Sequence, residues 1–232
     1  MLFDKDGTLC RSDGYLCALA QARAQFCVEL CGEHSLMDPL LRAYGMDKGS
    51  LDPTGATAVA SRHDNLISTA TVLAAAGHSW AEARRWAGEA MAQADQLLAA
   101  DKAARTPPTA GLEQLLERLA KQGIKLAVLS SDTGPGLEAF LQTHGLRQWF
   151  SVVHGSDREP RKPDPAAVLE LCAELQVSPQ RCGLIGDAED DLTMAKAAGM
   201  GWSLAYTAGW QRPLNLQGSH GSLASWAEMP EL

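Results

Sequence analysis

The sequence predicts an α/β protein, in which a parallel sheet with helices on both faces is interrupted early in the chain by an all-helical insertion. From about residue 106 onward, helical segments alternate with short, continuously apolar segments, a pattern typical of a parallel sheet covered on both faces. Residues 15–105 show helical periodicity and no strand pattern. Residues 1–14 contain a short apolar segment, so we expect them to form one core domain with residues 106–232 around the insertion.

The insertion is predicted to contain four helices. In the first, apolar residues recur at helical spacing, at Leu16, Leu19, Phe26 and Leu30. The other three are expected over residues 36–44, over residues 56–76 and from Ser79 onward. Ser79 with Glu82 three residues later forms a capping-box pattern. Residues 45–55 are rich in Gly, Asp and Pro and are predicted to form a loop.

The second part of the core is predicted to alternate helices with strands. Strands are expected over residues 124–129, 150–153, 183–185 and 202–206, and helices over residues 110–123, over 137–144, after Asp164-Pro165 and up to Gly199. Asp164 suits the cap of a helix, and Pro165 suits its first turn. Residues 134–136 (Gly-Pro-Gly) lack the further glycine of a nucleotide-binding loop, so they are interpreted as the turn that opens a helix.

Composition excludes several classes of partner. The formal charge of −8 and the absence of a Lys/Arg run argue against binding to nucleic acid or to an anionic membrane. No apolar run has the length of a membrane span, and no segment resembles a signal peptide. The six cysteines contain no Cys-x-x-Cys pair, so reduced thiols are expected. We therefore expect a cytoplasmic protein; nothing in the sequence indicates an oligomeric state.

Acidic residues follow two of the predicted strands. In an extended segment Asp4 and Asp6 would project to one side and Lys5 to the other, and Gly7 would let the backbone turn sharply. Two such acids can hold a hard cation, and one can attack a substrate while the other moves protons. Taken alone, the same stretch is also typical of a simple turn. Asp187 would likewise leave a strand, with Asp191 one helical turn further on the same side.

Two more polar residues occupy equivalent places, although each also has an ordinary explanation. Ser130 follows a strand and could donate to a phosphate oxygen, but it could also be a loop or cap residue. Lys162 precedes a proline, so a stiff backbone could aim its ammonium at a carboxylate and a phosphoryl oxygen, although most lysines are merely solvated. Acids in a first helical turn suit the helix dipole, which explains Glu189 and Asp190 better than Asp187.

Together these residues resemble the haloacid dehalogenase superfamily of phosphohydrolases. Its four motifs are matched, in order, by residues 4–8 (Asp-Lys-Asp-Gly-Thr), by Ser130, by Lys162 and by residues 186–191 (Gly-Asp-Ala-Glu-Asp-Asp). Residues 123–130, 162–165 and 195–200 are similar to the phosphoglycolate phosphatase-like branch. The resemblance implies a Rossmann-like core, and it covers the insertion only in size and position, where this branch carries a helical cap of the C1 type.

The resemblance also implies a role for each residue. Asp4 would be the nucleophile that forms an aspartyl-phosphate, and Asp6 would protonate the leaving oxygen and then activate water. Ser130 and Lys162 would neutralise the transferring phosphoryl group, with Ser131 beside them where this branch often has asparagine. Mg²⁺ would be held by Asp4, by the backbone carbonyl of Asp6 and by the side chains of Asp187 and, through water, Asp191. The implied activity is that of a Mg²⁺-dependent phosphatase acting on a small phosphorylated metabolite, such as phosphoglycolate.

Some alternatives stay open. A carboxylate at Asp6 favours phosphate-ester chemistry over dehalogenation, but a hexose-phosphate mutase of the same superfamily would keep both aspartates. A non-catalytic binding protein that kept the scaffold, or a phosphoacceptor module of the receiver type, is a further possibility. In the cap, charged side chains could reach a substrate, but none is singled out for specificity: Arg11, Arg23, Arg42, Arg62 and His63. Only three residues precede Asp4, from which we expect either a less stable core or a native start further upstream.

Overall fold

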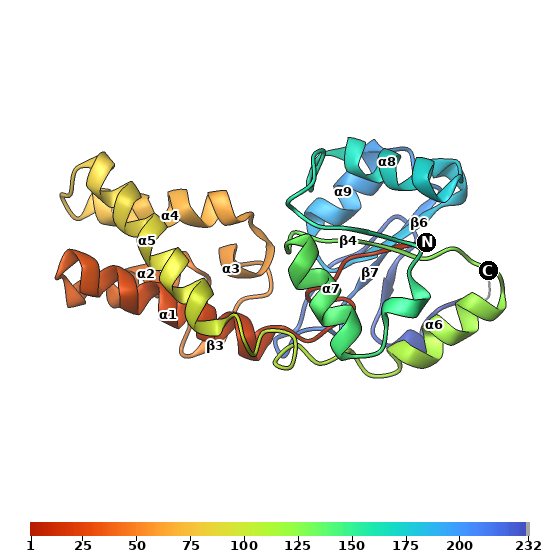
Figure 1. The fold of residues 1–232 in the computed structure, drawn as a ribbon, viewed down its shortest axis with the longest axis horizontal. Helices are drawn as coiled ribbons and strands as arrows, with labels where there is room; N and C mark the ends of the chain where they lie inside the picture. The colour runs from red at the N-terminus through yellow and green to blue at the C-terminus, as the bar shows by residue number, and fades with distance from the viewer. Residues whose placement is uncertain (231–232) are drawn as a thin grey trace. The chain divides into compact units, whose positions relative to one another are not determined.

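A computed structural model describes residues 1–230 of the chain. The chain divides into two compact units. The first, called the core unit, combines Met1–Ser12 with Thr106–Leu232, and the second, called the inserted unit, is Asp13–Arg105. Figure 1 colours the first piece of the core unit red and the second piece from yellow-green to blue, because the whole inserted unit separates them in the sequence.

The core unit is built on a six-stranded parallel sheet with the order β5-β4-β1-β6-β7-β8. The strands are β1 (Leu2–Phe3), β4 (Ala127–Leu129), β5 (Val152–His154), β6 (Gly183–Gly186), β7 (Trp202–Tyr206) and β8 (Ser222–Leu223). Leu2 is paired with Ala127 on one side and with Leu184 on the other. The short first strand therefore lies in the interior of the sheet, and its carboxyl end adjoins those of β4 and β6.

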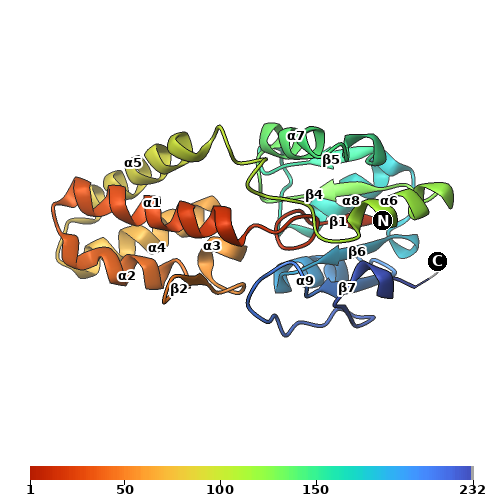
Figure 2. The ribbon, with the colours of Figure 1, turned by 90° about the horizontal axis from the view of Figure 1, so that it is seen from below.

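Helices cover both faces of this sheet (Figures 1 and 2). They are α6 (Leu112–Lys121), α7 (Gly134–Thr143), α8 (Pro165–Leu175) and α9 (Glu189–Ala197), with 3₁₀ turns η2 (Arg147–Trp149), η3 (Pro179–Arg181) and η4 (Trp226–Glu228). Each face has its own apolar cluster. The cluster beneath α6 and α7 contains Phe3, and the cluster beneath α8 and α9 contains Leu2.

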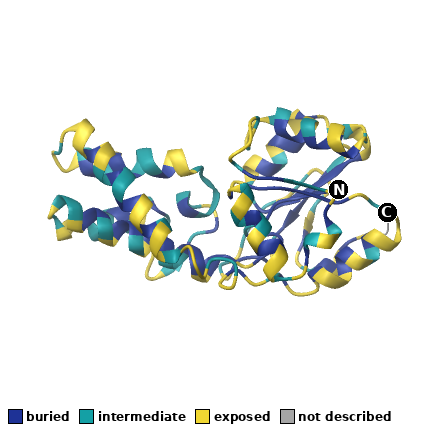
Figure 3. Cartoon of the chain, in the orientation of Figure 1, coloured by how far each residue is buried: buried dark blue, intermediate teal, exposed yellow. Residues whose placement is uncertain are grey.

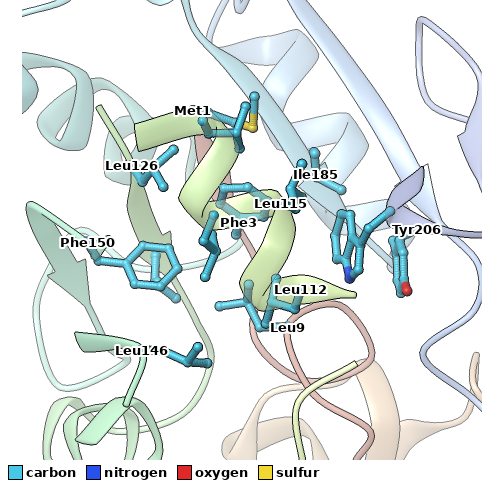
Figure 4. Packing of buried hydrophobic residues seen from close by; sticks show 14 of the residues in the cluster. Met1, Phe3, Leu9, Leu112, Leu115, Leu126, Leu146, Phe150, Ile185 and Tyr206 are labelled. Carbon is cyan, nitrogen blue, oxygen red and sulfur yellow. The ribbon is translucent and has the colours of Figure 1, made fainter. Parts of the chain in front are cut away.

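Alternation along β1 thus gives one fully buried side chain to each face of the sheet. Figure 4 shows Phe3 between Phe150 and Ile185. Its ring makes edge contacts with Phe150 and Trp226, at centroid distances of 6.2 and 6.1 Å. Packing on both faces, together with pairing to two neighbours, fixes the strand that leads to Asp4.

The inserted unit is mainly helical. It contains α1 (Asp13–Cys31), η1 (His34–Leu36), α2 (Met37–Ala43), α3 (Ala56–Val59), α4 (Arg62–Ala75) and α5 (Trp80–Leu98), and a two-stranded sheet of β2 (Met46–Asp47) and β3 (Ser50–Leu51). Four of the five buried positions of α5 are alanine, which lets its backbone approach its neighbours closely; the buried residues are Ala83, Ala87, Ala90, Met91 and Ala94. Figure 3 shows the resulting stripes of buried and exposed residues along these helices.

The predicted α/β class is confirmed, and so are several details. Ser79 caps α5, and its side chain accepts a hydrogen bond from the Glu82 amide. Asp164 caps α8, with Pro165 at its first position. Residues 134–136 open α7, as predicted, although that helix begins three residues earlier than expected. No helix within residues 1–230 combines the length and the apolar character that a membrane span requires.

Three local predictions were wrong. The insertion is not all-helical, because the predicted loop contains a hairpin, turned at Lys48 and Gly49 with φ angles of 49° and 80°. The predicted third helix is two helices, because Ala60 is extended and Ser61 starts a new helix by capping α4. The edge strand β8 was not predicted, since two residues carry no periodic signal. Strands β4 and β5 also differ from their predicted ranges by up to three residues.

Candidate active site

Three carboxylates meet at the carboxyl ends of β1 and β6. Asp4 directly follows β1, and its amide donates to the carbonyl of Ile185 in β6 at 2.9 Å. Asp187 directly follows β6, and Asp191 lies in the first turn of α9. Each side chain is buried and offers one oxygen, and these oxygens lie within 4.8 Å of one another. The structure therefore brings together three of the predicted metal ligands.

Two glycines make this close approach possible. Gly7 has φ = 77°, which confirms the predicted sharp turn, and a Cβ there would collide with the Asp187 carboxylate and the Trp210 ring. A Cβ at Gly186 would collide with the Asp191 carboxylate. Glycine is thus required at both positions, because the carboxylates occupy the space that any larger side chain would need.

The orientation of Asp187 is fixed by two buried donors. The Thr8 hydroxyl donates to one oxygen of Asp187, and the Trp210 indole N–H donates to the other, both at 2.8 Å. A carboxylate oxygen that accepts one hydrogen bond keeps a lone pair for a cation. Sequence reasoning missed both donors: nothing in the first motif distinguishes Thr8 as a partner of Asp187, and Trp210 lies in a segment without periodicity.

Lys162 lies against the same carboxylates. Its ammonium is 2.5 Å from an oxygen of Asp4 and 2.6 Å from an oxygen of Asp191. The loop before α8 carries this lysine, and the Asp164 cap fixes where the helix starts. The structure thus brings Lys162 to a carboxylate, as predicted, although Lys162 and Asp4 are 158 residues apart in the sequence.

The electrostatics of the site favour a cation. Three carboxylates face one ammonium, which leaves a formal excess of two negative charges. Burial raises the pKa of Asp4 to about 6, although Lys162 acts in the opposite direction. Burial, with the charges of Asp4 and Asp191, raises the pKa of Asp187 well above its usual range. Buried oxygens with unbalanced negative charge suit a hard divalent ion, so the residues present fit a Mg²⁺ site.

Lys162 itself stays charged in this environment. Burial alone would lower its pKa, but the carboxylates of Asp191 and Asp4 outweigh that effect and raise the pKa above its ordinary value. A permanently charged ammonium at this position can stabilise a bound anionic group.

The two predicted phosphate-binding serines differ in exposure. Ser130 directly follows β4, is 2% exposed and donates its amide to the His154 carbonyl at 3.0 Å. Its hydroxyl accepts from the Asp132 amide at 3.1 Å, which leaves the hydroxyl proton to donate elsewhere. Ser131 is exposed. Both belong to the loop at the same edge of the sheet as Asp4, one strand along.

The Asp6 side chain is held by donors from its own loop. Its carboxylate accepts from the Lys5 ammonium at 2.8 Å, from the Ser12 hydroxyl and from the Cys10 thiol at 3.6 Å. The expectation that Lys5 points away from both aspartates was therefore wrong. Strand β1 ends at Phe3, so the alternation of an extended segment does not continue through residues 4–6.

Comparisons with known proteins agree with this fold. A family model of haloacid dehalogenase-like hydrolases matches residues 1–199. A phosphoglycolate phosphatase of Pseudomonas putida is 32% identical over 111 residues, which is 46% of this chain. One of Psychrobacter arcticus is 35% identical over 98 residues, which is 40% of this chain. The matched segments span only 40% and 43% of those two relatives.

Solved structures match over nearly the whole chain. A Haemophilus somnus protein predicted to be a phosphoglycolate phosphatase has a TM-score of 0.66 and 20% identity, covering 97% of this chain and 93% of its own. At this identity the likeness concerns the fold alone. The resemblance found in the sequence is confirmed by the match over residues 1–199, and the chain belongs to the haloacid dehalogenase-like hydrolases.

Proposed function

We propose that this protein is a Mg²⁺-dependent phosphatase that hydrolyses a small phosphorylated metabolite, in the manner of a phosphoglycolate phosphatase. The observation that carries the proposal is the contact of Asp4 with Lys162, beside Asp187 and Asp191. A nucleophile, a fixed positive charge and a set of cation ligands then occupy one buried edge of the sheet. The phosphoglycolate phosphatases among its relatives support this class of substrate.

In the first step an oxygen of Asp4 attacks phosphorus, and the bond from phosphorus to the substrate's ester oxygen breaks. The product is an aspartyl-phosphate and an alcohol, whose oxygen takes a proton from Asp6. With a pKa of about 6, the Asp4 carboxyl is mostly ionised at neutral pH and can act as a nucleophile.

In the second step Asp6 takes a proton from water, and the water oxygen attacks phosphorus. The bond to Asp4 breaks, which releases inorganic phosphate and restores the Asp4 carboxylate. Asp6 thus returns to the protonation state in which it began. Lys162 and the Ser130 hydroxyl would neutralise and orient the phosphoryl oxygens during both steps, with Ser131 beside them.

Asp4, the backbone carbonyl of Asp6, Asp187 and Asp191 would hold the Mg²⁺. When bound, the cation supplies positive charge that offsets the carboxylates and polarises the phosphoryl group. Thr8 and Trp210 would keep the Asp187 oxygens oriented towards it.

We propose that the inserted unit acts as a cap that excludes water during the reaction. It lies in the sequence between Asp6 and Ser130, which is where a cap is expected in this family. The cytoplasm is the proposed location. Six free cysteines support it, since thiols persist in a reducing compartment.

Hydrolysis of p-nitrophenyl phosphate, with Mg²⁺ and with EDTA, tests the proposal. We expect activity only with Mg²⁺, and its loss in Asp4→Asn, while the exposed first-turn variant Asp190→Asn keeps it. Equal activity of wild type and Asp4→Asn would overturn the assignment of the nucleophile. A panel of phosphorylated acids and sugars, followed by release of inorganic phosphate, then identifies the substrate. Isomerised sugar phosphate in place of free phosphate would indicate a mutase.

A further inference from the structure

Lys5 is a buried charge that the proposed reaction does not use. Its side chain is 1% exposed, among the largest fully buried side chains of the core unit. A buried ammonium is costly unless carboxylates and hydrogen bonds compensate it. Here the compensation comes from two carboxylates: Asp6 at 2.8 Å and Asp132 at 3.2 Å.

The two carboxylates belong to different loops of the site. Asp6 follows β1, and Asp132 lies in the loop after β4, two residues beyond Ser130. Asp132 is firmly held, because one of its oxygens accepts from the Thr133 amide at 2.8 Å and its own amide donates to Ser130. Lys5 therefore connects the Asp6 carboxylate to a rigid point in the loop that carries Ser130.

The Asp6 carboxylate also accepts hydrogen bonds from two uncharged side chains. The Ser12 hydroxyl and the Cys10 thiol both donate to it, and a quarter of the side chain, 26%, is exposed. The bonds from Ser12 and Lys5 both gain strength from the charge of the carboxylate. Only the ammonium adds a full positive charge of its own, and Asp132 in turn anchors that ammonium. We infer that Lys5 is a positioning residue for Asp6: its ammonium, anchored by Asp132, fixes where the Asp6 carboxylate lies.

This inference rests on the proposed function, in which Asp6 protonates the leaving oxygen. Mispositioning a proton donor harms substrates with poor leaving groups most, because a nitrophenolate departs without a proton. The value of kcat/KM reports the step that expels the leaving group. A positioning effect is therefore visible as a larger loss of kcat/KM for an alkyl phosphate than for p-nitrophenyl phosphate.

The test variant is Lys5→Met combined with Asp132→Asn. Lys5→Met alone leaves two carboxylates without their cation and can fail to fold. Asp132→Asn removes one of those charges and keeps the oxygen that accepts from Thr133. Lys5→Arg retains the positive charge and is the matched control.

We expect the double variant to melt near the wild-type temperature and to lose about tenfold more kcat/KM with the alkyl phosphate than with p-nitrophenyl phosphate. Lys5→Arg should recover most of that difference. Equal losses with both substrates, or wild-type kcat/KM with both, would overturn the inference. If the wild type hydrolyses neither substrate, the proposed function fails, and crystal structures decide about Lys5 separately. If the Asp6 carboxylate of the double variant keeps its hydrogen bond from the Ser12 hydroxyl, the inference is overturned. A carboxylate displaced from this position would support it.

Discussion

Replacing Asp4 with asparagine should stabilise the metal-free protein while it abolishes the proposed hydrolysis. Asp4 is 8% exposed, and burial raises the pKa of its carboxyl from 3.8 to about 6. Asparagine has nearly the same shape, and its amide oxygen can still accept from the Lys162 ammonium, which lies 2.5 Å from Asp4. The substitution therefore removes the cost of a buried charge without removing the contact.

The size of the effect follows from the pKa difference. About two pKa units, at about 1.4 kcal/mol each, correspond to a gain on the order of 3 kcal/mol at pH 7.5. Between about pH 4 and pH 6 the folded wild type binds more protons than the unfolded chain, so its stability falls as the pH rises through this range. The advantage of Asp4→Asn should accordingly be roughly half as large at pH 5 as at pH 7.5.

Urea unfolding in EDTA, followed by circular dichroism at pH 5, 6 and 7.5, measures this advantage. Asp190→Asn is the matched control, because Asp190 is exposed in the first turn of α9. Losing a charge that suits the helix dipole should lower stability there by no more than about 1 kcal/mol. Adding Mg²⁺ should stabilise the wild type more than Asp4→Asn. A metal-free Asp4→Asn protein that is less stable than the wild type at pH 7.5, or a gain that does not change with pH, would refute the reasoning.

Three further substitutions test other contacts. Trp210→Phe removes the indole N–H that orients Asp187 and should weaken Mg²⁺ binding by about tenfold or more in a calorimetric titration; unchanged affinity would exclude that role. Gly7→Ala combines a positive φ with a collision against Asp187, so urea unfolding should register a loss of about 2 to 5 kcal/mol. A loss below about 1 kcal/mol would mean that the turn adapts. Ser79→Ala removes the cap of α5 and should cost about 1 kcal/mol, seen as faster hydrogen exchange in the inserted unit; exchange accelerated equally in the core unit would contradict this.

The parts of the fold that could be predicted from sequence are those with a local signal. Alternating helices and apolar strands predict the sheet of the core unit, and residues such as Ser79 and Asp164 mark helix starts through a single side chain. The hairpin at Lys48 was missed because a two-residue strand has no measurable period. Strand β8 was missed for the same reason, since only pairing with β7 makes it a strand.

The site divides in a similar way. Asp4, Lys162 and Asp187 could be predicted because parallel strands place their carboxyl ends at one edge of the sheet, whatever their separation in sequence. Trp210 could not, since its hydrogen bond to Asp187 depends on the path of an irregular segment. The position of the Asp6 carboxylate also escaped prediction, because its contact with Lys5 depends on where the chain brings Lys5 against Asp132.

The shortness of β1 does not make the position of Asp4 loose, because the strand is fixed by its surroundings rather than by its length. Both of its residues are fully buried, Leu2 in one apolar cluster and Phe3 in the other. Backbone hydrogen bonds connect its two ends to both neighbours: the Met1 carbonyl accepts from Ala127, and the Asp4 amide donates to Ile185. A carboxylate whose burial is unfavourable needs such a rigid support, since a looser strand would let Asp4 move towards water and away from Lys162. The apolar clusters on the two faces of the sheet thereby maintain the charge arrangement at its edge.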